Sequence, residues 1–283
     1  MSVQGAARST AQRTEGAANG RALENAARVG LLAYGLVHLL VAWLALQLAW
    51  GGGSGQEADQ SGAMATLARQ PFGKPLLWVI ALGLVALAVW QAAEILRWRG
   101  GWSATGKERR KAVFKSVKSA AKAIVYLGLA FLAIRFAVGS GQSSAQQQQQ
   151  KTAGVFSWPG GRFLVGVVGV VMIGIGVRHV YKGVTKRFLK EIDLSEASPS
   201  ATRLITRAGQ AGFPAKGVAL GLVGGMLLWA AITFDPSKAR GLDGALRALL
   251  SAPGGEAMLT IVGVGIVAFA VFCFARARYP ERT

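Results

Sequence analysis

The chain has 283 residues, of which 52% are hydrophobic and only 16% are charged, and its formal net charge is +19. Soluble domains carry about 25% charged residues, so this composition excludes an ordinary soluble enzyme and indicates a basic membrane protein. One Cys and two His exclude an internal disulfide framework and leave almost no ligands for a zinc or haem site, so no metal or other cofactor is expected.

Residues 1–27 come before the first apolar run and are rich in Ala, Gly, Thr and Arg. This composition predicts a disordered cytoplasmic tail. A cleavable signal peptide is not expected, because no short apolar segment comes before residue 29 and the first apolar run is long enough to stay in the bilayer.

Six apolar runs follow, and a helix needs about 20 mostly apolar residues to cross the hydrocarbon core. Four runs meet this requirement, at residues 29–50, 76–93, 217–234 and 257–275. Two are weaker, because Arg135 interrupts residues 123–138 and because residues 163–177 form a short run. Hydropathy alone therefore supports four spans strongly and two less strongly.

The distribution of Lys and Arg decides the number of spans. These residues are abundant in segments 1–28, 97–122, 178–216 and 276–283, and scarce in the three loops between them. Because cytoplasmic loops of membrane proteins are enriched in Lys and Arg, only six crossings explain this alternation. We expect an all-α, six-helix transmembrane bundle with both termini in the cytoplasm of a bacterial inner membrane.

A repeated phrase comes before the second helix of each pair, and it reads Pro71-Phe72-Gly73, Pro159-Gly160-Gly161 and Pro253-Gly254-Gly255. Pro and Gly in this order favour a tight turn into the first turn of a helix. The spacing between these three phrases also aligns His38 with Tyr126, and Glu94 with Lys182 and Arg276, as equivalent positions of the repeats. The chain is therefore predicted to be three tandem two-helix repeats, arranged either as a pseudo-threefold bundle or as an open row.

The repeats and the segments around them divide the chain as follows. Residues 28–99, 116–190 and 207–283 are repeats 1, 2 and 3, residues 100–115 form a basic cytoplasmic linker, and residues 191–206 form a second cytoplasmic linker.

Three residues in or near the spans are candidates for function. His38 is near mid-span and is either a proton acceptor or, as we favour, a partner in an interhelical hydrogen bond. Arg135 is an intramembrane charge, but it is close enough to the span's end for its side chain to reach the surface. The spacing of Glu94 favours a local ion pair with Arg97.

Gly217, Gly221 and Gly225 recur every four residues, a pattern typical of close helix packing. The basic segments, with Trp98 and Trp102, favour anionic phospholipid headgroups as partners over nucleic acid. A membrane protein partner or a second copy of the chain is compatible with the glycine faces. We find no Walker A loop, no zinc protease motif and no nucleophile elbow, so an enzyme is not favoured.

The third repeat carries the phrase Asp235-Pro236, then Gly241-Leu242-Asp243, then Pro253-Gly254-Gly255, and closes with Arg276-Ala277-Arg278-Tyr279. It resembles the DUF1206 family, bacterial membrane proteins described by a pair of transmembrane helices that occurs three times. The resemblance covers about residues 28–279 and implies topology without an assigned activity. Asp235 and Asp243 match the pattern, and Asp243 is expected to cap or start a short external helix.

Three functions remain open on the sequence. The first is a non-enzymatic scaffold or partner-binding protein whose basic surface lies on lipid. The second is a small-solute or ion permease with a path along the bundle axis, and the third is an enzyme that acts on lipid. A permease predicts a polar cavity that His38 or Arg135 faces, whereas a scaffold predicts a closed core.

Overall fold

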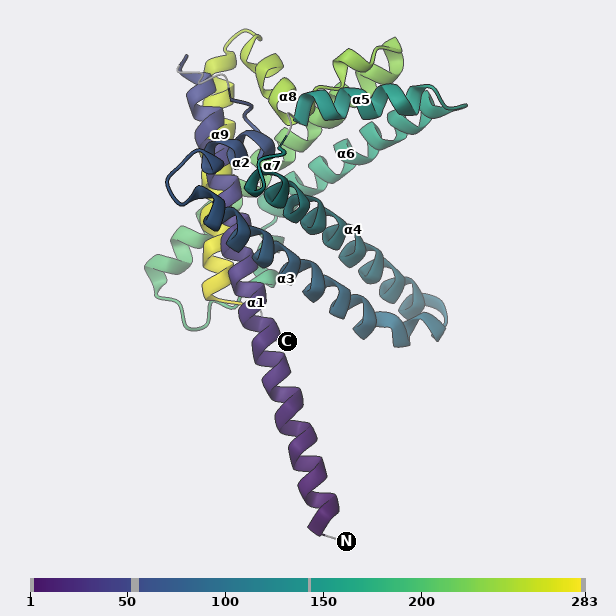
Figure 1. Ribbon diagram of the computed structural model, residues 1–283, viewed down its shortest axis with the longest axis vertical. Helices are drawn as coiled ribbons and strands as arrows, with labels where there is room; N and C mark the ends of the chain where they lie inside the picture. Colours follow the sequence, from purple (N-terminus) through teal and green to yellow (C-terminus); the bar gives the residue numbers. More distant parts are fainter. Residues whose placement is uncertain (1–2, 52–55, 142–143, 281–283) are drawn as a thin grey trace.

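The computed structural model describes residues 3–51, 56–141 and 144–280, which are almost wholly helical (Figure 1). The long helices are α1 (Val3–Ala49), α3 (Gly73–Arg99), α4 (Gly106–Ala137), α6 (Gly161–Val184), α7 (Pro199–Thr233) and α9 (Gly255–Arg278). The short helices are α2 (Gln60–Ala68), α5 (Ser144–Phe156) and α8 (Gly241–Leu250), and the 3-10 turns are η1 (Gly100–Ser103), η2 (Arg187–Glu191) and η3 (Pro236–Lys238).

Within the described residues, six helices are long and apolar enough to cross a membrane, and each contains one predicted span. The two weak runs are helical as well, in α4 and α6, so the all-α transmembrane architecture is confirmed. The helices extend beyond the apolar runs: α7 has 35 residues, or about 52 Å, against a hydrocarbon core of about 30 Å.

The N-terminal segment differs from the expected disordered tail, because α1 begins at Val3 and continues without a break to Ala49. In Figure 1 the first part of this helix projects away from the other elements. The physical reason lies in the composition of residues 3–27, where Ala, Arg, Gln and Glu all favour helix and no Pro interrupts the run.

The two ends of the bundle have different characters. The cap face, defined by α2, α5 and α8, contains the three connections within the repeats. The basic face, defined by η1, η2 and the end of α9, contains the connections between the repeats and most of the Lys and Arg. This separation of charge matches the alternation in the sequence.

The main packing partners come from different repeats. The second helix of each repeat packs most extensively on the first helix of the next, which gives the pairs α3–α4, α6–α7 and α9–α1. Contacts between α1 and α3 and between α7 and α9 join these pairs, whereas α4 and α6 diverge in Figure 1. This cyclic order is compatible with pseudo-threefold symmetry, which stays a prediction.

The Pro-x-Gly phrase starts the second helix in the same way in each repeat. The middle residue is the N-cap and has a positive φ, 62° at Phe72, 76° at Gly160 and 70° at Gly254. The final glycine begins the helix and donates its N–H to a carbonyl three residues earlier, at 2.8–2.9 Å. A Cβ on that glycine would collide with the backbone of the preceding short helix.

Glycines bring α6 and α7 into close contact. A Cβ on Gly217 would lie 2.5 Å from the Gly176 carbonyl oxygen, and one on Gly224 would lie 2.7 Å from that of Gly169. Two members of the predicted set, Gly221 and Gly225, have open space beside them, because no atom within 4 Å would meet a Cβ on either. Gly221 still belongs to the close approach, because a Cβ on Gly176 would lie 3.1 Å from the Gly221 nitrogen, whereas Gly225 takes no part in it.

The geometry of a helix explains this difference. Residues seven apart drift by only about 20° around the axis, whereas residues eight apart differ by about 80°. Gly217 and Gly224 therefore share one face, which excludes Gly225. Such packing matters in a bilayer because lipid tails supply no hydrophobic drive between helices, so van der Waals contact must hold them together.

Candidate functional site

A polar cluster lies inside the bundle where repeats 1 and 3 meet. The ammonium group of Lys216 on α7 donates a hydrogen bond to the Tyr34 hydroxyl on α1, and its Nζ lies 3.3 Å from Nε2 of His38. Nδ1 of His38 lies 2.8 Å from the carbonyl oxygen of Tyr34, one turn earlier on the same helix. The interhelical contact expected for His38 is thus present, and Lys216 is its partner.

Aromatic rings surround this cluster. The Lys216 ammonium lies 4.1 Å from the ring centre of Phe269 and 4.8 Å from that of Tyr34. Tyr126 meets the Tyr34 ring edge-on at 5.5 Å, and Phe269 lies 5.0 Å from the His38 ring. Cation–π attraction stabilises a cation in such a place, and among the described residues no carboxylate forms an ion pair with Lys216.

Lys216 was not a sequence candidate, because it ends the basic segment 178–216 and the apolar run starts after it. In the structure α7 begins at Pro199, so Lys216 lies in the middle of a helix. One signal was available, since the separations that align the Pro-x-Gly phrases also place Tyr34, Lys122 and Lys216 at the same position of the three repeats. These three side chains come from the first helix of each repeat.

A second cluster, centred on Glu191 of η2, lies on the basic face. The Glu191 carboxylate forms ion pairs with Lys182 of α6 at 2.8 Å and with Arg276 of α9 at 3.5 Å. Lys182 and Arg276 are the equivalent positions at the ends of two second helices. Lys122 of α4 interacts electrostatically with all three groups.

The cations decide the ionisation of Glu191. Burial raises the pKa of this carboxyl group, but Arg276 and Lys182, with a smaller effect of Lys122, outweigh burial and lower the pKa to about 2. Glu191 is therefore an anion at neutral pH, in a site with more cations than anions.

An aromatic pair connects the two clusters. Lys182 lies 4.1 Å from the ring centre of Phe213, Lys216 lies 4.1 Å from that of Phe269, and the two rings meet edge-on at 5.3 Å. Phe188 of η2, fully buried, stacks on Phe213 at 5.4 Å. The 3-10 turn η2, which follows α6, is thus fixed to the bundle by its own aromatic side chain.

Arg135 and Glu94 lie apart from both clusters. Arg135 is in the last turn of α4, toward the cap face, and donates a hydrogen bond to the Ser140 carbonyl at 2.8 Å. Glu94 is near the other end of the bundle and pairs with Arg97 at 2.8 Å, three residues along α3. The structure therefore brings neither residue to His38.

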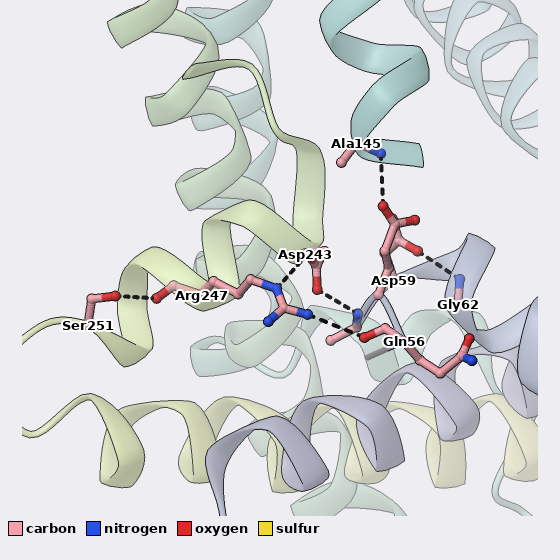
Figure 2. Close-up of polar contacts among 9 residues, drawn as sticks. Gln56, Asp59, Gly62, Ala145, Asp243, Arg247 and Ser251 are labelled. Carbon is pink, nitrogen blue, oxygen red and sulfur yellow. Dashed lines mark hydrogen bonds and ion pairs between the residues drawn. The ribbon is translucent and has the colours of Figure 1, made fainter. Parts of the chain in front are cut away.

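The two aspartates lie on the cap face, in different environments, and Figure 2 shows the contacts of Asp243. Asp243 is buried in α8, accepts a hydrogen bond from the Ala58 N–H at 2.8 Å and pairs with Arg247 at 2.8 Å. The N-cap of α8 is Arg240, so Asp243 does not cap its own helix; it lies in the first turn and instead holds the loop of repeat 1. Asp235 caps η3, where the hydroxyl and the N–H of Ser237 hold its pKa below the ordinary value.

Other contacts on the cap face connect the loops of all three repeats. Arg247 donates to the Gln56 carbonyl at 3.4 Å, and the Ala145 N–H at the start of α5 donates to the Glu57 carboxylate at 3.3 Å. Asp59 caps α2 through the Gly62 N–H. The cap face is therefore an interlocked assembly of loops from all three repeats.

Two shallow pockets open near the cap face, and neither contains His38 or Arg135. One, of about 430 Å³, lies between α5, α6 and α7 and includes Gln147, Lys151 and Thr152. The other, of about 330 Å³, lies between α1 and α2. The described part of the chain groups no three His, Cys, Asp or Glu side chains that could hold a metal ion.

The fold and the two clusters define an integral membrane protein built from three helix pairs. The chain belongs to the family described as a domain of unknown function, DUF1206, which matches residues 29–94, 117–186 and 211–280, one repeat each. It is also 30% identical over 256 residues to the uncharacterized protein YxxB of Bacillus subtilis (strain 168), with 90% of each chain covered. No solved structure matches the chain.

Proposed function

We propose that the protein is a non-enzymatic membrane component, a scaffold or a partner-binding protein, whose basic face lies against anionic lipid headgroups on the cytoplasmic side of a bacterial inner membrane. The observation that supports this most directly is the start of α4. Lys107, Arg109, Arg110 and Lys111 are all exposed in its first two turns, beyond the apolar part of the helix.

This basic segment has a defined position. Lys115 lies 3.7 Å from the ring centre of Trp98, and the Trp102 indole N–H donates to the Ser116 hydroxyl at 3.0 Å. These contacts fix the start of α4 against the end of α3 and η1. Each Lys or Arg near an anionic leaflet contributes about 1 kcal/mol, and Trp rings favour the same interface, so a fixed basic helix suits a lipid surface.

The test measures which lipids stay with the purified protein. The native chain is expected to retain phosphatidylglycerol in preference to phosphatidylcholine, and the preference should weaken with salt. A variant with Lys107, Arg109, Arg110 and Lys111 all changed to Gln should lose most of this preference while keeping its helix content. Equal retention of both lipids by the native chain would refute the proposal.

A small-solute or ion permease is a second candidate, favoured by the Tyr34, His38 and Lys216 cluster inside the bundle. Transport by this cluster requires the polar contacts of His38 to change during turnover. Proteoliposome uptake that His38→Ala abolishes, with folding intact, would support a permease. Uptake that His38→Ala leaves unchanged would count against a role for His38 in transport.

A further inference from the structure

A pocket on the cap face has one polar wall and one apolar wall. This α5 pocket is the cavity of about 430 Å³ between α5, α6 and α7. The polar wall, from α5, includes Gln147, Lys151 and Thr152, and the apolar wall, from α6 and α7, includes Leu164, Val168 and Leu227. Small-molecule sites have volumes of about 300–1,000 Å³, so this cavity is large enough to hold part of a ligand with a polar end and an apolar end.

The hydroxyl of Thr152 is a buried polar group without a partner in the fold. Thr152 is only 6% exposed, and it forms no hydrogen bond among the residues that the structure describes. Other helical threonines behave differently, because Thr66, Thr233 and Thr260 each donate to the carbonyl oxygen four residues earlier, at 2.7–2.8 Å. Burial of a hydroxyl without a hydrogen bond is unfavourable. The Thr152 hydroxyl is therefore available to a ligand in the α5 pocket.

The charge of the pocket favours an anion. Lys151 is exposed at its edge and forms no ion pair or hydrogen bond within the described part of the chain, and the lining contains no Asp or Glu. The ammonium group of Lys151, the hydroxyl of Thr152 and the amide of Gln147 can all donate hydrogen bonds. A carboxylate accepts such bonds and balances the charge of one lysine.

The apolar wall continues onto a surface that lipid chains can cover. Among the six described spans, α6 has the smallest buried share, 17%, and on it Leu164 and Val168 are 47% and 43% exposed. In Figure 1 α5 runs back over the start of α6. Because α5 contains the run Gln146–Gln150, it is too polar for the hydrocarbon core. The pocket thus lies where a polar surface helix meets an apolar spanning helix, as the two ends of an amphiphile require.

We propose that the α5 pocket binds a long-chain fatty acid, with its carboxylate at Lys151 and Thr152 and its acyl chain along α6. The first part of the chain contacts Leu164, Val168 and Leu227. The moderate volume and the single lysine of the lining favour one acyl chain and one charge over a two-chain phospholipid. The site is on the opposite face of the bundle from the basic face, so it does not depend on the lipid surface proposed above.

The test uses the full-length chain in phosphatidylcholine nanodiscs and a palmitate probe with a diazirine close to the carboxylate. After photolysis, mass spectrometry locates the crosslinked residues, and competition by unlabelled palmitate gives the affinity. We expect saturable crosslinks in peptides that contain Thr152, Leu164 or Leu227. Crosslinks spread without saturation over the exposed faces of all six spans would show a probe dissolved in the bilayer and would overturn the site.

Lys151→Gln tests the carboxylate contact, because removal of a lysine without a partner breaks no contact within the described fold. It should weaken palmitate binding by about fivefold, since it removes the one cation at the site. Lys74→Gln is the matched control, an exposed lysine at the cap end of α3 outside the pocket, and its effect should stay below about twofold. Methyl palmitate, which has no charge, should bind equally weakly to the native chain and to Lys151→Gln.

Thr152→Val tests the buried hydroxyl with almost no change of shape. It should weaken palmitate binding by about threefold and should raise the melting temperature of the ligand-free protein, because an unpaired buried hydroxyl is replaced by a methyl group. A role in packing alone would not produce these opposite changes. A lower melting temperature with unchanged palmitate binding would overturn the contact with Thr152.

Val168→Phe tests the apolar wall, because the larger side chain would occupy part of the cavity. Val170→Phe is the matched control, since Val170 is 56% exposed on the same helix and lies outside the lining. We expect only Val168→Phe to reduce the saturable crosslinking, by about tenfold. Equal effects of the two phenylalanine variants, or of the two glutamine variants, would overturn the site. Competition by phosphatidylglycerol as strong as that by palmitate would overturn the assignment to a fatty acid.

Discussion

The buried carboxylate of Asp243 accepts a hydrogen bond from the backbone N–H of Ala58 at 2.8 Å, although 185 positions separate the two residues. The same carboxylate pairs with Arg247, which in turn reaches the Gln56 carbonyl. One side chain of repeat 3 thus fixes the loop of repeat 1, so the cap face should be sensitive to small changes at this position.

Asp243→Asn should destabilise the protein by about 1–3 kcal/mol. The amide oxygen can keep the Ala58 hydrogen bond, but the amide NH2 group would then face Arg247 as donor against donor. Thermal unfolding in detergent measures the effect. Asp235→Asn is the matched control, because Asn still caps η3 and only an exposed ion pair of 3.7 Å is lost, so its effect should stay within about 0.5 kcal/mol.

Gly224→Ala should destabilise the α6–α7 pair by about 1–3 kcal/mol, because the added methyl group would meet the backbone of Gly169. Gly225→Ala should be neutral or should stabilise the helix by up to about 1 kcal/mol, since Ala has the higher helix propensity and open space surrounds the position. Denaturation of the two variants side by side compares neighbours in one helix. A larger loss for Gly225→Ala would contradict the packing described.

The N-caps of the second helices in repeats 1 and 2 should respond to substitution with opposite changes in stability. Gly160→Ala places a side chain at φ 76° and should cost about 1 kcal/mol, whereas Phe72→Gly relieves the same strain and should stabilise by a similar amount. The Phe72 side chain is 86% exposed, so its removal leaves no cavity. Melting temperatures measured in one detergent should fall for Gly160→Ala and rise for Phe72→Gly, relative to the native chain.

Acid should remove the contribution of Glu191 to stability. Its pKa is about 2 in the folded protein, below the ordinary value of 4.5, so the group stabilises the fold above about pH 4.5 and this stabilisation disappears as the pH falls toward 2. Unfolding measured across this range should show the loss, and Glu191→Gln should flatten that part of the profile. An unchanged slope in the variant would assign the acid sensitivity to other groups.

Labelling can establish the orientation of the chain. In a Cys273→Ala background, Ser237→Cys on the cap face should react with a membrane-impermeant thiol reagent in intact cells. Ser195→Cys, exposed on the basic face, should react only after permeabilisation. The opposite result would place the basic face outside and would contradict the cytoplasmic position that we propose for the termini.

Much of this architecture could be predicted from the sequence, because its causes are local or periodic. The apolar runs, the alternation of basic loops and the Pro-x-Gly phrases each specify a helix or its start from neighbouring residues. The Glu94–Arg97 pair was equally predictable, because i,i+3 residues are neighbours on a helix surface.

The rest depends on contacts between distant segments. The Asp243 carboxylate was expected to act within α8, and nothing near it in the sequence indicates Ala58. Lys216 was assigned to a loop because hydropathy ends a span at a charge, whereas the rings of Tyr34 and Phe269, from two repeats, accommodate it inside the bundle. The choice of Gly224 over Gly225 likewise depends on how α6 crosses α7.

The pairing of α9 with α1 has a consequence for biosynthesis. Because α1 packs on α9, the surface of α1 that faces α9 must stay uncovered until α9 has been synthesised and inserted. Chains truncated before Gly255 should therefore enter the bilayer with an unmatched α1, and these are the species that membrane quality-control proteases would meet.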